Sequence, residues 1–364
     1  MIVFCMASGF AQAQKFPPPF TNIGDDAPLL RVQRWLKGTP VTRYEKGKIY
    51  VISFWATWCK PCRAEMPRLS AISRKYKGAV SVIDIDIYER STTTLQDLQA
   101  NTDSLDYTIA IADTSFTEKD WLIATGEFHT GIPIAFIVDR NGKLAWAGHP
   151  CDNFEESLAG IINNNWDNNI ARANKILEFR LRNLDDSLTD QLEFAPDGNF
   201  RSASWKRDSG MLLIDEWAKT IPLIKFTPRI AYQLFFNLLN NDIPKACVYG
   251  RKVLETSTYD APAAMMIRGA IENAAEKIKL PPEVYQLGID AIKVQINDIL
   301  SCFPELKNVS KHYYKMSEWY WHLANRSKAV EALEKAIEIT KTQAGYSARE
   351  LTVYNVRLRQ YKTK

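Results

Sequence analysis

The sequence predicts an α/β domain followed by an all-α domain. Strand-like and helix-like patterns alternate from residue 15 to about residue 164, and only helical patterns follow in residues 166–364. A length of 364 residues is too great for one ordinary domain, and each half is long enough to bury its own core. Alternating strands and helices are typical of a sheet that helices cover.

The first half contains six strand-like segments and four helical ones. The strand-like segments, rich in β-branched and aromatic residues, are 29–35, 49–55, 79–87, 107–112, 134–138 and 144–147. Helical spacing of apolar residues predicts helices at 60–76, 92–101, 117–125 and 154–163. Asn141-Gly142, between the last two strands, predicts a tight hairpin turn.

The second half reads as a series of helices. They are predicted at 171–192, 210–220, 228–239, 244–255, 261–278, 282–299, 310–323, 327–340 and 347–361. Near residues 310–340, the apolar and small positions Tyr313, Met316, Ser317, Tyr320, Ala329, Leu333 and Ala336 match the spacing of a tetratricopeptide repeat. Two interpretations stay open, a helical-repeat-like domain and a plain helical bundle.

Composition argues against two classes of protein. The chain is 46% hydrophobic and 24% charged, and it lacks the run of about eighteen apolar residues that a membrane-spanning helix needs. Its formal net charge of +4 is spread thinly, without a Lys/Arg stripe that would follow phosphates. We therefore expect neither a membrane span nor a nucleic-acid partner.

Residues 1–13 resemble a secretory signal peptide. An apolar run at 2–10 precedes Ala11-Gln12-Ala13, which fits a small-x-small cleavage site, although no basic residue precedes the run. The alternative is an apolar tail. Export is the expectation, and five cysteines then remain in the mature chain, of which only Cys59 and Cys62 are close in sequence.

The pair Cys59 and Cys62 follows a buried-type strand and begins a helix. Free backbone N–H groups and the positive end of the helix dipole favour a thiolate at that position, so we expect Cys59 to be the nucleophile. The i, i+3 spacing places Cys62 on the same helix face, where it can resolve a mixed disulfide. A zinc site would need further cysteines or histidines at suitable spacing, and a structural disulfide would close only a small loop.

The segment from Phe54 to Cys62 resembles the thioredoxin active-site signature, and closely that of the extracytoplasmic TlpA/ResA-like branch. Pro67 falls where that family kinks its active-site helix, and the segment from Gly131 to Asp139 is similar to its cis-proline segment. The resemblance covers residues 15–164. It implies a thioredoxin-like fold with a central mixed sheet flanked by helices and an additional strand and helix between Cys62 and Pro133.

The same resemblance implies further site residues. Pro133 is expected to carry a cis peptide bond, with the backbone of Ile132 pairing with an extended substrate segment. Gly148 resembles the glycine that the family places beside the dithiol. Trp58 is expected to be half exposed and to pack on a partner, with Lys60 and Pro61 beside it.

The sequence departs from many thioredoxins at Ser53, where they hold a buried aspartate that relays protons. The TlpA/ResA-like branch instead can place a glutamate one turn after the second cysteine, and Glu65 stands there. A partly buried carboxyl at that point would have a raised pKa and would exchange protons with the dithiol. A solvated Glu65 is the alternative, and Glu89 is a second candidate.

These residues predict an extracytoplasmic, bacterial thiol-disulfide oxidoreductase. The resemblance implies disulfide-containing exported proteins as substrates, an upstream membrane thiol reductase as electron donor, and no cofactor beyond the Cys59–Cys62 pair. Lys60-Pro61 between the cysteines favours a reductant. The competing hypothesis is an interaction protein that binds partners through its helical half, while Ala56, three residues before Cys59, disfavours a thiol peroxidase.

Overall fold

The computed structural model describes residues 19–90, 92–128, 131–194, 206–256, 261–302, 309–342 and 348–363. The chain divides into two compact units, residues 17–179 and a helical unit from residue 180 onward. The predicted signal peptide at residues 1–13 lies outside the described residues. None of the helices in the described part of the chain combines the length and apolar character needed to cross a membrane.

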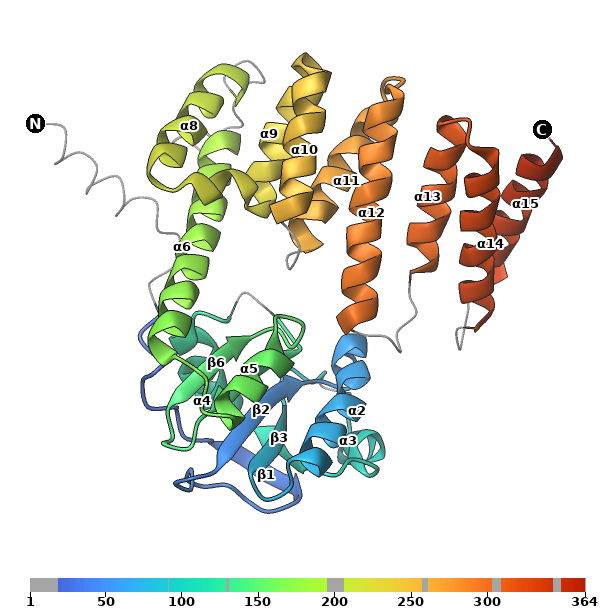
Figure 1. The fold of residues 1–364 in the computed structure, drawn as a ribbon. Coiled ribbons are helices and arrows are strands. Elements are labelled where there is room, and N and C mark those ends of the chain that lie inside the picture. The colour runs from blue at the N-terminus through green and yellow to red at the C-terminus, as the bar shows by residue number, and fades with distance from the viewer. Residues whose placement is uncertain are drawn as a thin grey trace, which may run out of the picture. The chain divides into compact units, whose positions relative to one another are not determined.

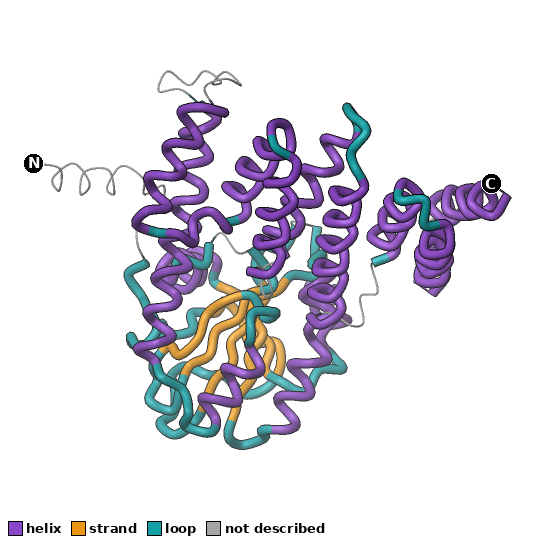
Figure 2. Tube along the Cα trace, turned by 45° about the horizontal axis from the view of Figure 1, so that its top comes forward, coloured by secondary structure: helices purple, strands orange, loops and turns teal. Residues whose placement is uncertain are grey.

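The first unit is an α/β sandwich around a six-stranded mixed sheet (Figures 1 and 2). In chain order its elements are β1 (Val32–Lys37), β2 (Ile49–Trp55), α2 (Lys60–Lys75), β3 (Val80–Asp86), α3 (Leu95–Thr102), β4 (Thr108–Ala112), α4 (Thr114–Thr117), η1 (Glu118–Ile123), β5 (Ile134–Val138), β6 (Leu144–Gly148) and α5 (Phe154–Ile162). The strand order is β1-β4-β3-β2-β5-β6. The predicted α/β class is confirmed, and β4 with its flanking helices forms the additional strand–helix segment between α2 and β5.

The sheet places β2 at its centre, which is why every residue of β2 is buried. β2 runs parallel to β3 and antiparallel to β5, and β3 runs parallel to β4. Helices α2, α3 and α5 cover one face, and Trp121 of η1 packs with segment 23–27 on the other. Side chains alternate between the faces along each strand, so position within β2 and β3 decides which layer a residue joins.

One predicted helix differs in kind from the expectation. Residues 117–125 were expected to form an α-helix, whereas the chain forms a single α-turn in α4 and continues as the π-helical η1. The wider π-turn contains the fully buried Trp121, whose ring contacts Phe54 and Phe136 edge to face. The local spacing of apolar residues does not indicate how this large side chain packs.

The regular elements in the described part of the second unit are all helices. It contains the end of α6 (Asn168–Glu193), η2 (Lys206–Gly210), α8 (Met211–Thr220), η3 (Pro222–Phe226), α9 (Pro228–Asn241), α10 (Ile243–Thr256), α11 (Ala261–Ala275), α12 (Pro282–Cys302), α13 (Ser310–His322), α14 (Arg326–Thr342) and α15 (Ala348–Thr363). Contacts run mainly between helices that are adjacent or next-but-one in sequence, as in helical-repeat proteins. The predicted repeat-like segment forms the hairpin of α13 and α14, and Met316, Tyr320 and Leu333 are buried in it.

Helix α6 begins in the α/β unit, and the division between the units falls inside this helix, between residues 179 and 180. The sequence pattern predicts it before the helix, near residue 166. Arg172 of α6 pairs with Asp25 at 2.7 Å, and Lys175 forms an ion pair with the buried Glu127. Phe179 packs against Gly126. These contacts hold the first turns of α6 against the α/β unit, a tertiary effect that a change in sequence pattern does not indicate.

Candidate active site

Cys59 and Cys62 form a disulfide at the start of α2. The S–S distance is 2.03 Å, and the two Cα atoms lie 5.3 Å apart. Cys59 is the N-cap of the helix and Pro61 lies in its first turn, where proline is favoured because that N–H would have no intrahelical partner. The predicted placement of the pair, between β2 and α2, is confirmed.

The helix start is suited to stabilise a thiolate on Cys59. The backbone N–H of Cys62 donates to Sγ of Cys59 at 3.2 Å, and the first turn of α2 contains no acidic residue. A hydrogen bond to sulfur and the positive end of the helix dipole both favour the charged form of a thiol. This geometry supports Cys59 as the nucleophile once the disulfide is reduced.

The segment before β5 approaches the dithiol from the other side. The Ile132–Pro133 peptide bond is cis, as predicted, and the Ile132 carbonyl oxygen lies 3.7 Å from Sγ of Cys59. Ile132 is partly exposed while Pro133 is buried. Gly148 pairs with Ala135, two residues after Pro133, and an added Cβ there would lie 3.2 Å from the Trp146 ring.

A second group of contacts fixes the loop that precedes Cys59. The carboxylate of Glu89 accepts from the backbone N–H of Thr57 and, at 2.8 Å, from its hydroxyl. The indole N–H of Trp58 donates to the carbonyl oxygen of Tyr88 at 2.9 Å, and Tyr88 has a left-handed φ of 61°. Glu89, named from sequence as a candidate for proton transfer, therefore holds this loop, and Trp58 is 42% exposed beside Cys59.

Glu65 is buried, not solvated, one turn after Cys62. Only 2% of the residue is exposed, and burial raises its pKa to about 7, against the opposing effect of Arg68. Arg68 Nε donates to Glu65 Oε1 at 2.6 Å, and its Nη2 donates to the Pro150 carbonyl oxygen at 2.8 Å. The predicted raised pKa is thus present, and Arg68 is a site residue that the sequence did not indicate.

Two further buried acids face the same layer of the sheet. Asp84 and Asp86 lie at the carboxyl end of β3, are 1% and 3% exposed, and have pKa values that burial raises to about 8. Asp86 is hydrogen-bonded to Glu89, whose negative charge raises the pKa of Asp86 further. The only sequence signal was the alternation of aspartate with isoleucine in 83–87, which is equally typical of a strand with one solvated face.

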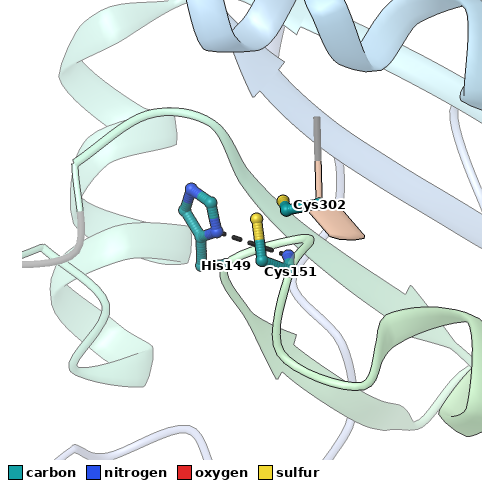
Figure 3. A group of neighbouring side chains, drawn as sticks. All are labelled: His149, Cys151 and Cys302. Atoms are coloured by element: carbon teal, nitrogen blue, oxygen red, sulfur yellow. Dashed lines mark hydrogen bonds between the residues drawn. The ribbon is translucent and has the colours of Figure 1, made fainter. Parts of the chain in front are cut away.

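The remaining predicted residues border the site. Lys60 is exposed and Pro61 partly exposed at the helix start. Beyond Gly148, the loop carries His149 and Cys151, and the backbone N–H of Cys151 donates to Nδ1 of His149 at 3.3 Å (Figure 3). Burial and the charge of Arg68 lower the pKa of His149 to about 4, so its ring is neutral at physiological pH.

A cysteine pair at a helix N-terminus, next to a cis-proline loop on a mixed α/β sheet, defines the class of protein. The protein is a thioredoxin-like thiol-disulfide oxidoreductase.

Comparison with known proteins agrees with this class. A family model described as the AhpC/TSA family matches residues 23–147. Protein FixW of Rhizobium leguminosarum is 32% identical over 155 residues, which are 40% of this chain and 68% of the relative. The thiol-disulfide oxidoreductase ResA of Bacillus cereus is 32% identical over 149 residues, 40% of this chain and 80% of ResA.

Among solved structures, a thiol-disulfide isomerase from Corynebacterium glutamicum is 19% identical with a TM-score of 0.32, covering 39% of this chain and 97% of that one. On the sequence relatives, the chain belongs to the family of ResA-like thiol-disulfide oxidoreductases.

Proposed function

We propose that the protein reduces disulfide bonds of exported proteins by dithiol exchange outside the cytoplasm. The observation that supports this proposal best is the Cys59–Cys62 disulfide, with Sγ of Cys59 bound to a helix N–H and facing the Ile132 carbonyl. The apolar run and small-residue site at 1–13 support export, and Lys60-Pro61 between the cysteines supports reduction.

The reaction has two exchange steps. The Cys59 thiolate attacks one sulfur of the substrate disulfide, and the other substrate sulfur leaves as a thiolate. Cys62 then loses its proton and attacks Sγ of Cys59, which re-forms the intramolecular disulfide and releases the substrate in its dithiol form. Two electrons pass to the substrate, and an upstream membrane thiol reductase returns them to the pair. No cofactor takes part in this scheme.

Substrate would bind as an extended segment along the Ile132–Pro133 loop. Ile132 is partly exposed beside Cys59, so its backbone is available to pair with a strand-like peptide. On the other side, the Trp58 ring is exposed and its indole N–H is already bound, which leaves its apolar faces for a partner side chain. Lys60, Pro61 and Gly148 complete this surface.

Glu65 would exchange a proton with the dithiol. Its burial holds its pKa near neutrality, so that the carboxyl can both give and accept a proton at physiological pH. Arg68 keeps the side chain in place through its hydrogen bond. A merely structural glutamate would not influence the pH dependence of the exchange.

Insulin reduction tests the enzymatic part of the proposal. With dithiothreitol as the donor, the wild-type chain should precipitate reduced insulin, whereas Cys59→Ser should be inactive. Cys247→Ser is the matched control because Cys247 is a free, buried thiol of the helical unit. A wild-type protein as slow as Cys59→Ser would overturn the proposal.

A trapping experiment tests substrates and location. In Cys62→Ser the second step cannot occur, so mixed disulfides with Cys59 should accumulate. Exported proteins among the trapped partners would support the proposal, and exclusively cytoplasmic partners would contradict the extracytoplasmic location.

A second candidate function is partner binding by the helical unit. A cavity of about 710 Å³ beside α13 and α14 is lined by Tyr313, Met316 and Tyr320 together with charged residues of α14. If binding were the main function, loss of Cys59 would leave the protein's biological role intact. The thiol peroxidase hypothesis stays disfavoured, because Ala56 occupies the position where a peroxidase needs a residue with a hydroxyl group.

A further inference from the structure

Asp84 is a buried acid that the exchange scheme above does not use. It lies on β3 directly opposite Ser53 of β2, in the parallel register that pairs these strands. Residues on either side of Ser53 in that layer, Val51 and Trp55, belong to the same core cluster as Cys62. Because paired residues of neighbouring strands face the same way, Asp84 points into the layer that contains the dithiol.

The surroundings of Asp84 hold its carboxyl in place, and no basic group of the described residues acts on it. Ser53 forms a side-chain hydrogen bond with it, and the hydroxyl of Tyr107, which precedes β4, lies 3.4 Å from Oδ2. Oδ1 has no hydrogen-bond partner among the described residues. Glu65 from α2 and Asp86 on the same strand are the other titratable groups that act on it, and both are acids.

Glu65 and Asp84 thus differ in one respect. The carboxylate of Glu65 is bound by Arg68, which favours its charged form. In the part of the chain that the structure describes, Asp84 has no basic partner, and the charge on Glu65 disfavours a second charge nearby. Of the two coupled acids, Asp84 is therefore the one that retains a proton in the oxidised protein at neutral pH.

We propose that Asp84 is a second proton-exchanging residue of the dithiol, beside Glu65, and holds the proton that passes to and from the Cys62 sulfur, and that Ser53 occupies its position in the preceding strand to fix the Asp84 carboxyl. This inference rests on the proposed function. When a donor thiolate attacks Cys59, the Cys59–Cys62 bond breaks, Cys62 leaves with the electron pair, and the Asp84 carboxyl gives its proton to that sulfur. When Cys62 later attacks the mixed disulfide, its proton returns to the Asp84 carboxylate, and the released substrate thiolate takes a proton from water.

The rate of disulfide reduction across pH tests this role. Stopped-flow fluorescence would follow the reduction of oxidised full-length protein by dithiothreitol, with each rate divided by the fraction of dithiothreitol in its thiolate form. As Asp84 ionises near pH 8, the acid is lost and its charge repels the leaving thiolate. The corrected wild-type rate should fall about tenfold between about pH 7 and pH 9.

Asp84→Asn should abolish this fall, because the amide cannot ionise. In the wild-type protein the hydrogen bond from Tyr107 lowers the pKa of Asp84, so Tyr107→Phe should raise that pKa and move the fall to higher pH. This variant keeps the Asp84 carboxyl, so it also provides a test if Asp84→Asn does not fold. Asp103→Asn, an exposed acid of the same unit, is the charge-matched control and should behave as wild type.

A fall that persists in Asp84→Asn, or that disappears in Asp86→Asn instead, would overturn the proposal, as would a fall at unchanged pH in Tyr107→Phe. These outcomes are separate from those of the insulin assay. Dithiothreitol reduces the pair whether or not the protein acts on exported proteins, so failure of the proposed function leaves this test valid.

Discussion

Replacing Glu65 by glutamine should change how the stability of the oxidised protein depends on pH. Burial raises the pKa of Glu65 from 4.5 to about 7 in the folded protein, and Glu65 is only 2% exposed. Between these two pH values the unfolded chain has released the proton while the folded protein still holds it. The folded state therefore loses stability as the pH rises through this window, and the loss is complete above about pH 7.

The size of the effect follows from the two pKa values. Each tenfold difference in proton affinity corresponds to about 1.4 kcal/mol, so the interval from 4.5 to about 7 corresponds to about 3 kcal/mol. Glutamine cannot ionise and keeps an oxygen for the hydrogen bond from Arg68. The free energy of unfolding of Glu65→Gln, relative to wild type, should thus increase by about 3 kcal/mol between pH 4.5 and pH 8.

Guanidinium unfolding of both proteins at a series of pH values measures this difference. Asp86 also has a raised pKa, but it is present in both proteins and its contribution largely cancels. The charge of Glu65 is one cause of the raised pKa of Asp84, so its removal changes the relative stability in the same direction as the effect predicted for Glu65 itself. The comparison also removes any constant effect of the substitution on packing. A relative stability that changes by less than about 1 kcal/mol over this range would refute the assignment of a buried, proton-binding Glu65.

Two further predictions concern single contacts. Arg68→Leu should raise the pKa of Glu65 above about 7, because the arginine lowers it; carboxyl NMR titration would show this, and an unchanged value would mean that the ion pair has no influence. Gly250→Ala should destabilise the helical unit by about 1–3 kcal/mol in urea unfolding, because the new Cβ would lie 2.6 Å from Leu287. Gly269→Ala is the matched control, because no described atom beyond its own stretch of helix would lie within 4 Å of the added Cβ. It should stabilise its helix by up to about 1 kcal/mol, and equal effects of the two changes would contradict the packing argument.

Local patterns predicted the elements that carry the dithiol. The bounds predicted for β2 and β5 agree with the structure, because short apolar, β-branched runs form buried strands whatever the rest of the chain does. The placement of Cys59 and Cys62 at a helix start needed only the order of strand, motif and helix. The cis bond before Pro133 followed from resemblance to a family, since its sequence neighbours alone permit either isomer.

The sequence by itself determined the class of the protein: an alternating strand–helix half followed by a helical half, a cysteine pair placed to form a thiolate, and Ser53 in place of a buried acid. Only the tertiary structure decided where the acids of the site lie. Strand register brings Asp84 opposite Ser53 although thirty-one positions separate them in the chain. Burial in the folded domain raises the pKa of Glu65, against the effect of the neighbouring Arg68. Both effects depend on distances between segments that are far apart in sequence, and local patterns contain no information on those distances.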